Sequence, residues 1–211
     1  MFDFDGTLVD SMPTYVAAML RLLDDHHVAY GDDLVKTITP LGLYGAARYF
    51  QQIGLDMAVE EQVEEMKTHM LDAYLYHIPA KRNVIPVLRA LQAENVELNV
   101  LTASPHITLD GCLKRLGIFE CFANVWSCDD FATTKSDPEI YRMAAQKLGK
   151  RPDEILFLDD NLDADRTAGA AGMKVCGVYD DASRDYIVEM KKAADAFIDD
   201  FIQLPALLKR L

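Results

Sequence analysis

The chain has 211 residues, of which 50% are hydrophobic, and its formal net charge is -13 at neutral pH. This length and composition predict a globular protein with a sizeable core, arranged as one large or two modest domains. The acidic balance disfavours nucleic acid and anionic membranes as partners, because both require a basic surface. No apolar run approaches the ~18 residues needed to span a bilayer, so we expect a cytoplasmic location.

The first predicted element is an extended segment over residues 1–5, inside the string MFDFDGTLVDS. In a strand, Asp3 and Asp5 would project from the same face. Gly6 and Thr7 then predict a turn. Two carboxylates this close stay ionised together only beside a cation, and an all-oxygen pair suits Mg²⁺. A carboxylate can also be a covalent nucleophile, so the pair indicates phosphoryl chemistry, whereas a lone DxDG would favour a simple strand end.

Residues 12–80 predict an all-helical insert. Asp10 and Ser11 are good N-caps and Pro13 fits a first helical turn, so a helix should begin here. Further helices are predicted up to residue 78 from apolar positions that recur at helical spacing. Solvated helix surface, rather than a metal site, is the interpretation for His26 and His27 and for the acids Glu60, Glu61, Glu64 and Glu65.

From residue 81 onward, predicted strands alternate with amphipathic helices, the strands being ELNVL, ANVW, EILFL and MKVCGVY. This alternation predicts a parallel, doubly wound sheet. Ligands of such sheets bind beyond the carboxyl ends of the strands. The candidate reactive groups fall at these ends or between the strand and helix units: Asp3, Asp5, Thr102, Ser104, Lys135, Asp159 and Asp160.

The segments DFDGTLVDS, TAS, TTKSDPEIY and FLDDNLDADRTAGAAGM occur in the order of the four motifs of the haloacid dehalogenase (HAD) superfamily. Over essentially its whole length the chain resembles the branch that contains phosphoglycolate phosphatase and β-phosphoglucomutase. The resemblance implies a Rossmann-like α/β core over residues 1–11 and 81–211. It also implies that residues 12–80 form a helical cap domain, which closes over the substrate.

The resemblance implies a role for each acid and for the lysine. Asp3 would attack phosphorus, while Asp5 would protonate the leaving oxygen and later activate water. Mg²⁺ would be held by the Asp3 side chain, the Asp5 carbonyl group and Asp160, with Asp159 coordinating directly or through water. Lys135 would neutralise the nucleophile and the phosphoryl charge.

The phosphate would be bound by the turn and by the second motif. Thr102 would contribute its hydroxyl, and the backbone N–H groups of Ala103 and Ser104 would bind phosphate oxygens at the start of a helix. Gly6, in the turn after the acids, is included among the phosphate-binding residues.

In the cap, the segment PLGLYGAARYF (residues 40–50) would face the substrate, and Tyr44 and Arg48 are the candidates to reach it. For Arg48, an exposed helix charge is an equal alternative. One departure from the family lies at the start of the chain, where only Met1 and Phe2 precede the first acid. Either the first strand is unusually short, or residues are missing before Met1.

The first hypothesis is a Mg²⁺-dependent phosphatase that hydrolyses small phosphorylated metabolites through an aspartyl-phosphate intermediate. A phosphomutase resembling β-phosphoglucomutase is the alternative, although Tyr15 stands where those enzymes carry His. The presence of Asp5 disfavours a dehalogenase. The complete set of acids and lysine disfavours a catalytically silent phosphate-binding regulator. We expect a monomer, with a dimer as the alternative.

Overall fold

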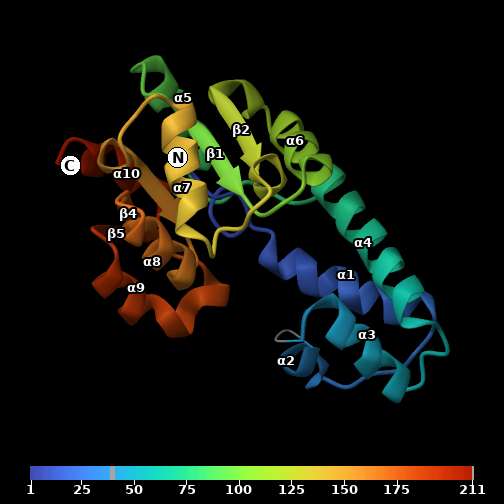
Figure 1. The fold of residues 1–211 in the computed structure, drawn as a ribbon. Coiled ribbons are helices and arrows are strands. Elements are labelled where there is room, and N and C mark those ends of the chain that lie inside the picture. The colour runs from blue at the N-terminus through green and yellow to red at the C-terminus, as the bar shows by residue number, and fades with distance from the viewer. Residues whose placement is uncertain (39–40, 211) are drawn as a thin grey trace. The chain divides into compact units, whose positions relative to one another are not determined.

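A computed structural model of the protein describes residues 1–38 and 41–210. The chain forms two compact units, an α/β unit of Met1–Asp10 with Pro79–Leu211 and a helical unit of Ser11–Ile78 (Figure 1). These boundaries differ by one or two residues from the predicted ones at 11 and 80. Pro40, at the start of the predicted substrate-facing segment, lies outside the described residues.

The strands of the α/β unit are short and pair in parallel. They are β1 (Asn99–Thr102), β2 (Asn124–Ser127), β3 (Leu156–Asp159), β4 (Lys174–Val178) and β5 (Ala196–Ile198). β1 pairs with β2, and β4 lies between β3 and β5. Parallel pairing brings the carboxyl ends of all these strands to one edge of the sheet.

The start of the chain joins the two groups of strands. Phe2 bridges in parallel to both Val100 of β1 and Leu158 of β3. The Phe2 N–H donates to the Asn99 carbonyl group at 2.8 Å, and the Asp3 N–H donates to the Leu158 carbonyl group at 2.8 Å. The order is therefore β2, β1, the first residues, β3, β4 and β5. The predicted strand over residues 1–5 is shorter than expected, because the chain turns immediately after these contacts.

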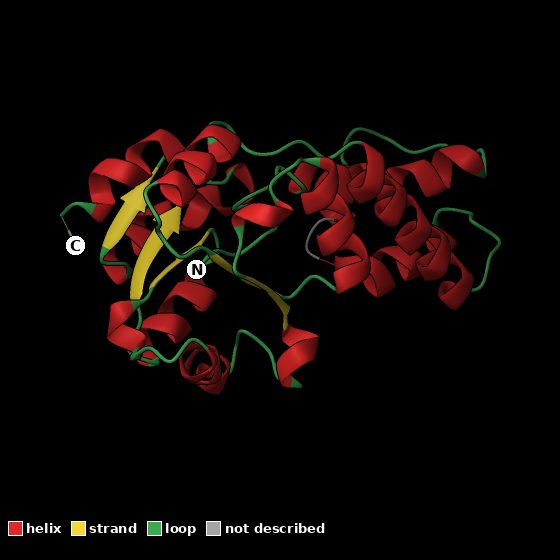
Figure 2. Ribbon diagram, turned by 90° about the horizontal axis from the view of Figure 1, so that it is seen from above, coloured by secondary structure: helices red, strands yellow, loops and turns green. Residues whose placement is uncertain are grey.

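Helices cover both sides of the strands (Figure 2). They are α5 (Val84–Ala93), α6 (His106–Arg115), α7 (Pro138–Lys147), α8 (Leu162–Ala170), α9 (Ile187–Ala193) and α10 (Leu204–Leu208). Short 3-10 turns span Phe119–Cys121, Cys128–Phe131, Pro152–Glu154, Asp181–Tyr186 and Phe201–Gln203. This arrangement confirms the predicted fold class, a doubly wound α/β core with a helical insert.

The core beside β3 and β4 places α7 and α8 close to the sheet. Tyr141 of α7 packs edge-on against Phe157 of β3, with ring centroids 5.1 Å apart. From α8, Ala164 and Ala168 are buried in the same cluster. Small side chains let a helix approach a sheet closely, so α8 holds the end of β3 in a fixed position.

The helical unit consists of α1 (Met12–Asp25), α2 (Leu34–Ile38), α3 (Gly42–Gln52) and α4 (Val59–Tyr76). Its core is formed by apolar residues of these helices, including Met19, Leu22, Phe50 and Met66. α1 begins where predicted, with Ser11 at the N-cap position, but the Ser11 hydroxyl is buried and makes no hydrogen bond within the described residues. None of the described helices is long and apolar enough to cross a membrane.

Candidate active site

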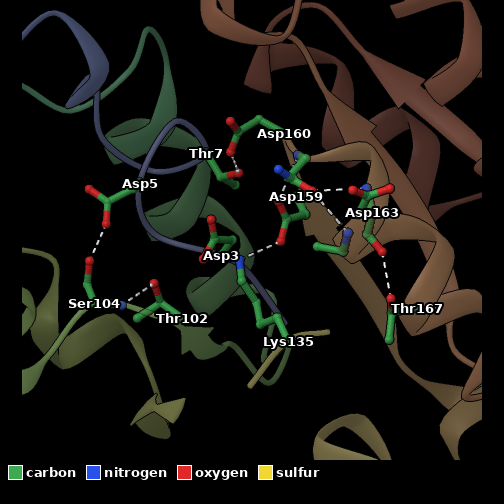
Figure 3. A network of polar contacts seen from close by, with 12 residues as sticks. Asp3, Asp5, Thr7, Thr102, Ser104, Lys135, Asp159, Asp160, Asp163 and Thr167 are labelled. Carbon is green, nitrogen blue, oxygen red and sulfur yellow. Dashed lines mark hydrogen bonds and ion pairs between the residues drawn. The ribbon is translucent and has the colours of Figure 1, made fainter. Parts of the chain in front are cut away.

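Asp3 and Lys135 meet at the carboxyl edge of the sheet. Asp3 is 5% exposed, and its Oδ1 lies 2.8 Å from the Lys135 Nζ. The same ammonium group lies 2.8 Å from Asp159 Oδ2, so one lysine bridges the ends of two neighbouring strand segments (Figure 3). The Tyr141 hydroxyl donates to the Lys135 carbonyl group at 3.2 Å, which positions the loop that carries the lysine.

The charge of Lys135 is permanent in this environment. Burial alone would lower its pKa, but the charges of Asp159 and Asp3 outweigh that cost and raise the pKa well above the usual value. Lys135 can therefore neutralise negative charge at the site.

Asp160 completes a trio of buried acids with Asp3 and Asp159. Their carboxylate oxygens lie within 4.8 Å of one another. Burial raises the pKa of Asp160 well above its usual value, and the neighbouring charges of Asp159 and Asp3 add to that shift; burial also raises the pKa of Asp159. One lysine cannot balance three carboxylates. The all-oxygen donor set therefore fits a hard divalent cation such as Mg²⁺, which would keep the acids ionised.

The turn at Gly6 depends on the absence of a side chain. Its φ is +71°, and a Cβ atom there would lie 2.3 Å from Asp160 Oδ2. Only glycine tolerates both this conformation and this close approach. The Thr7 hydroxyl then donates to Asp160 Oδ1 at 2.9 Å. The turn thus brings the first motif against the acid that ends β3.

The second motif lies at the end of β1, opposite Asp5. The Ser104 hydroxyl donates to Asp5 Oδ2, and the Ser104 N–H donates to Thr102 Oγ1 at 3.2 Å (Figure 3). Thr102 is buried, whereas Ala103 is exposed and Ser104 is half-buried. Only the backbone N–H of Ser104 was predicted to take part in the site. In the structure its side chain also contributes, because the hydroxyl orients Asp5.

Tyr44 and Arg48 belong to the helical unit, on α3. Both side chains are exposed, and they lie one helical turn apart. Their assignment to the substrate stays a prediction.

Lys81 and Asp165 were missed by sequence reasoning. The Lys81 ammonium group donates to the Gly6 and Tyr179 carbonyl groups, each at 2.5 Å, and to Asp180 Oδ2 at 2.9 Å. It therefore ties the Gly6 turn to the end of β4. No local pattern reveals this, because its partners lie 75 to 99 residues away.

Asp165 lies on the inner face of α8, fully buried, and neither carboxylate oxygen has a hydrogen-bond partner within the described residues. Burial, together with the charges of Asp159 and Asp160, raises its pKa to about 9. The protonated form of Asp165 is therefore favoured. The periodicity of the predicted helix could have shown that Asp165 faces inward. It could not have shown that its carboxylate lacks hydrogen-bond partners.

A doubly wound sheet whose strand ends gather acids, a lysine and hydroxyl groups defines an enzyme of the α/β class. The family model for haloacid dehalogenase-like hydrolases matches residues 1–172. The chain is 29% identical over 213 residues to the phosphoglycolate phosphatase of Rhodospirillum rubrum, a match that covers 97% of this chain and 88% of the relative.

Solved structures show the same fold. A Thermotoga maritima protein provisionally assigned as a β-phosphoglucomutase superposes with a TM-score of 0.86 at 21% identity, covering 100% of this chain and 97% of that chain. YfnB of Bacillus subtilis, provisionally assigned as a HAD hydrolase and solved with bound magnesium, gives a TM-score of 0.83 at 17% identity, covering 99% of this chain and 96% of that chain.

The chain therefore belongs to the haloacid dehalogenase-like hydrolases. The predicted family is confirmed, with a phosphoglycolate phosphatase among the relatives, as is the prediction that the protein is a phosphatase enzyme.

Proposed function

We propose that the protein is a Mg²⁺-dependent phosphatase that hydrolyses small phosphate monoesters through an aspartyl-phosphate intermediate. The observation that carries this proposal is the position of Lys135 Nζ, 2.8 Å from both Asp3 and Asp159, inside a trio of buried acids. A fixed cation beside a carboxylate nucleophile lets a second anion, the phosphate group, approach it.

In the first step, an Asp3 oxygen forms a bond to phosphorus while the bond from phosphorus to the ester oxygen breaks. The ester oxygen takes a proton from Asp5, and the alcohol leaves. The hydrogen bond from Ser104 holds the Asp5 carboxyl group at the edge of the site. Lys135 reduces the charge repulsion between Asp3 and the incoming phosphate.

In the second step, Asp5 removes a proton from a water molecule, whose oxygen attacks phosphorus and releases Asp3 and inorganic phosphate. Bound Mg²⁺ would supply charge compensation for the phosphoryl oxygens, held by Asp3, Asp159, Asp160 and the Asp5 carbonyl group. The backbone N–H groups after Thr102, at the start of α6, are proposed to bind the phosphate, with Gly6 leaving space beside it.

We infer that residues 12–80 act as a cap and that Tyr44 and Arg48 help to select the substrate. The relative named phosphoglycolate phosphatase supports a small phosphorylated metabolite as the substrate class. The cytoplasmic location and the monomeric state stay predictions from the sequence.

The test is phosphate release from a panel of phosphorylated metabolites, measured with Mg²⁺ for the wild type and for Asp3→Asn. We expect release by the wild type alone. Rapid acid quenching with radiolabelled substrate should trap label on the wild-type chain and none on Asp3→Asn. Equal release by the two proteins would remove Asp3 as the nucleophile.

A phosphomutase is the second candidate, supported by the fold shared with the Thermotoga maritima protein. Incubation with β-glucose 1-phosphate distinguishes the two functions. Glucose 6-phosphate as the main product would favour the mutase, and free phosphate would favour the phosphatase.

A further inference from the structure

A group of histidine and carboxylate side chains lies in the helical unit, away from the acids that the proposed reaction uses. Asp25 and His26 stand at the end of α1, while Glu65 and His69 stand one turn apart on α4. We call these four residues the histidine–carboxylate cluster. His26 is exposed, as expected for a solvated helix end, and its Nε2 also lies 3.1 Å from Glu65 Oε1.

We propose that the histidine–carboxylate cluster is a zinc site that clamps the end of α1 to the middle of α4. Asp25, Glu65 and His69 each offer a ligand atom, and these atoms lie within 4.8 Å of one another. His26 lies beside these three residues and is the candidate for a fourth ligand, because its Nε2 lies 3.1 Å from Glu65 Oε1.

Two contacts within the cluster have the spacing of neighbouring ligand atoms on a tetrahedral ion. With metal–ligand bonds of about 2.1 Å, the ligand atoms of tetrahedral zinc lie roughly 3.4 Å apart. His69 Nε2 lies 3.3 Å from Asp25 Oδ2, and His26 Nε2 lies 3.1 Å from Glu65 Oε1. Two edges of the tetrahedron are therefore close to their final length.

The surroundings of His69 favour metal binding through Nε2. Its ring is buried, and Nδ1 lies 3.4 Å from the Ala18 carbonyl oxygen. A proton on Nδ1 would be donated to this oxygen, which leaves the Nε2 lone pair directed at Asp25. A backbone acceptor behind a ligating imidazole is the usual arrangement in metal sites.

The donor set selects the class of ion. Two imidazoles and two carboxylates suit zinc and similar transition metals, whereas Mg²⁺ and Ca²⁺ prefer oxygen ligands alone. Asp25 and Glu65 are 48% and 31% exposed at their side chains, so an ion can enter from solvent. Arg21 is the competitor, because its Nε lies 3.5 Å from Asp25 Oδ2.

The experiment titrates Zn²⁺ into the full chain, produced without a histidine tag, in the presence of excess Mg²⁺ to fill the acids at the strand ends. Calorimetry should give one zinc ion per chain for the wild type. Glu65→Gln and His69→Gln should weaken the affinity at least tenfold, and Arg21→Ala should not weaken it. His77→Gln is the matched control, since His77 follows the same helix outside the cluster.

Two further measurements keep the test decisive. The visible absorption of bound Co²⁺ should have the high intensity of a four-coordinate site and should fall in His26→Gln, an exposed position where folding is not at risk. An Asp160→Asn background should retain the zinc ion, which separates the cluster from the strand-end acids. The absence of zinc uptake by the wild type under Mg²⁺, or equal binding by the His69 and His77 variants, would overturn the proposal.

Discussion

The strand-end site of the α/β unit and the exposed face of α3 in the helical unit are constructed in opposite ways. Asp3 and Asp159 are buried, Lys135 is half-buried, and the three hold one another through contacts between distant parts of the chain. Tyr44 and Arg48 are exposed neighbours on a single helix. A buried charge network tolerates little change, whereas exposed helix positions can vary at small cost. We therefore expect substitutions in the buried network to affect the reaction itself and substitutions of Tyr44 or Arg48 to affect substrate binding.

The largest expected effect is a loss of kcat on substitution of Asp3 in the strand-end site. Asp3→Asn should lower kcat by roughly ten-thousand-fold, because loss of a covalent nucleophile removes the proposed pathway. Phosphate release under saturating substrate measures it. Asp163→Asn, which changes an exposed acid on α8, is the control and should stay within about twofold of the wild type. A variant of Asp3 with a tenth of the wild-type activity would contradict the assignment.

Without a metal ion, the buried acids should make the free energy of unfolding depend on pH. Burial raises the pKa of Asp159, Asp160 and Asp165. The folded state then keeps protons that the unfolded chain has released, so the contribution of these three acids to stability is largest below about pH 4 and falls as the pH rises through their raised pKa values. Urea unfolding in EDTA should show a loss of roughly 4 kcal/mol between pH 5 and pH 8 for each of these acids that keeps its proton over that range.

Saturating Mg²⁺ should reduce this pH dependence, because the ion stabilises the ionised carboxylates, and it should restore the activity that EDTA removes. Identical pH profiles with and without Mg²⁺ would show that the acids do not hold the ion.

A glycine in each unit gives a matched pair. Gly6 and Gly42 have φ values of +71° and +63°, but a Cβ atom meets Asp160 at the first position and nothing within 4 Å at the second. Alanine at either position should cost about 1 kcal/mol of stability because of the backbone conformation. Only Gly6→Ala should also lower kcat, by about a hundredfold, because displacing Asp160 disturbs the site. Parallel kinetics and unfolding curves measure both effects, and equal kinetic losses would refute the steric argument.

The smallest effect is expected for the exposed residue Arg48 on α3. Arg48→Ala should raise KM about tenfold, the value of one lost charge-assisted hydrogen bond to a phosphate, and leave kcat within about twofold. Arg142→Ala on α7 is the control, since Arg142 is an exposed helix arginine of the other unit. A change in kcat alone, or equal effects of the two variants, would remove Arg48 from the substrate site.

Prediction from sequence succeeded where the information was local. The alternation of strands and helices, the inserted helices and the acids at the strand ends can all be recognised within short segments. The network that supports the acids is not local. Lys81 reaches Gly6 and Asp180 across 75 and 99 residues, and Ser104 reaches Asp5 across 99. Such contacts depend on which strands become neighbours.

The sequence by itself determined the order of the elements, the fold class and the type of residue at each strand end, because hydrophobic periodicity and turn composition act over a few residues. Only the tertiary structure decided that three acids and one lysine lie within contact distance, that Gly6 has no room for a side chain and that His69 faces Asp25 across two helices. These facts follow from the close packing of distant segments, in which the position of each side chain depends on all its neighbours.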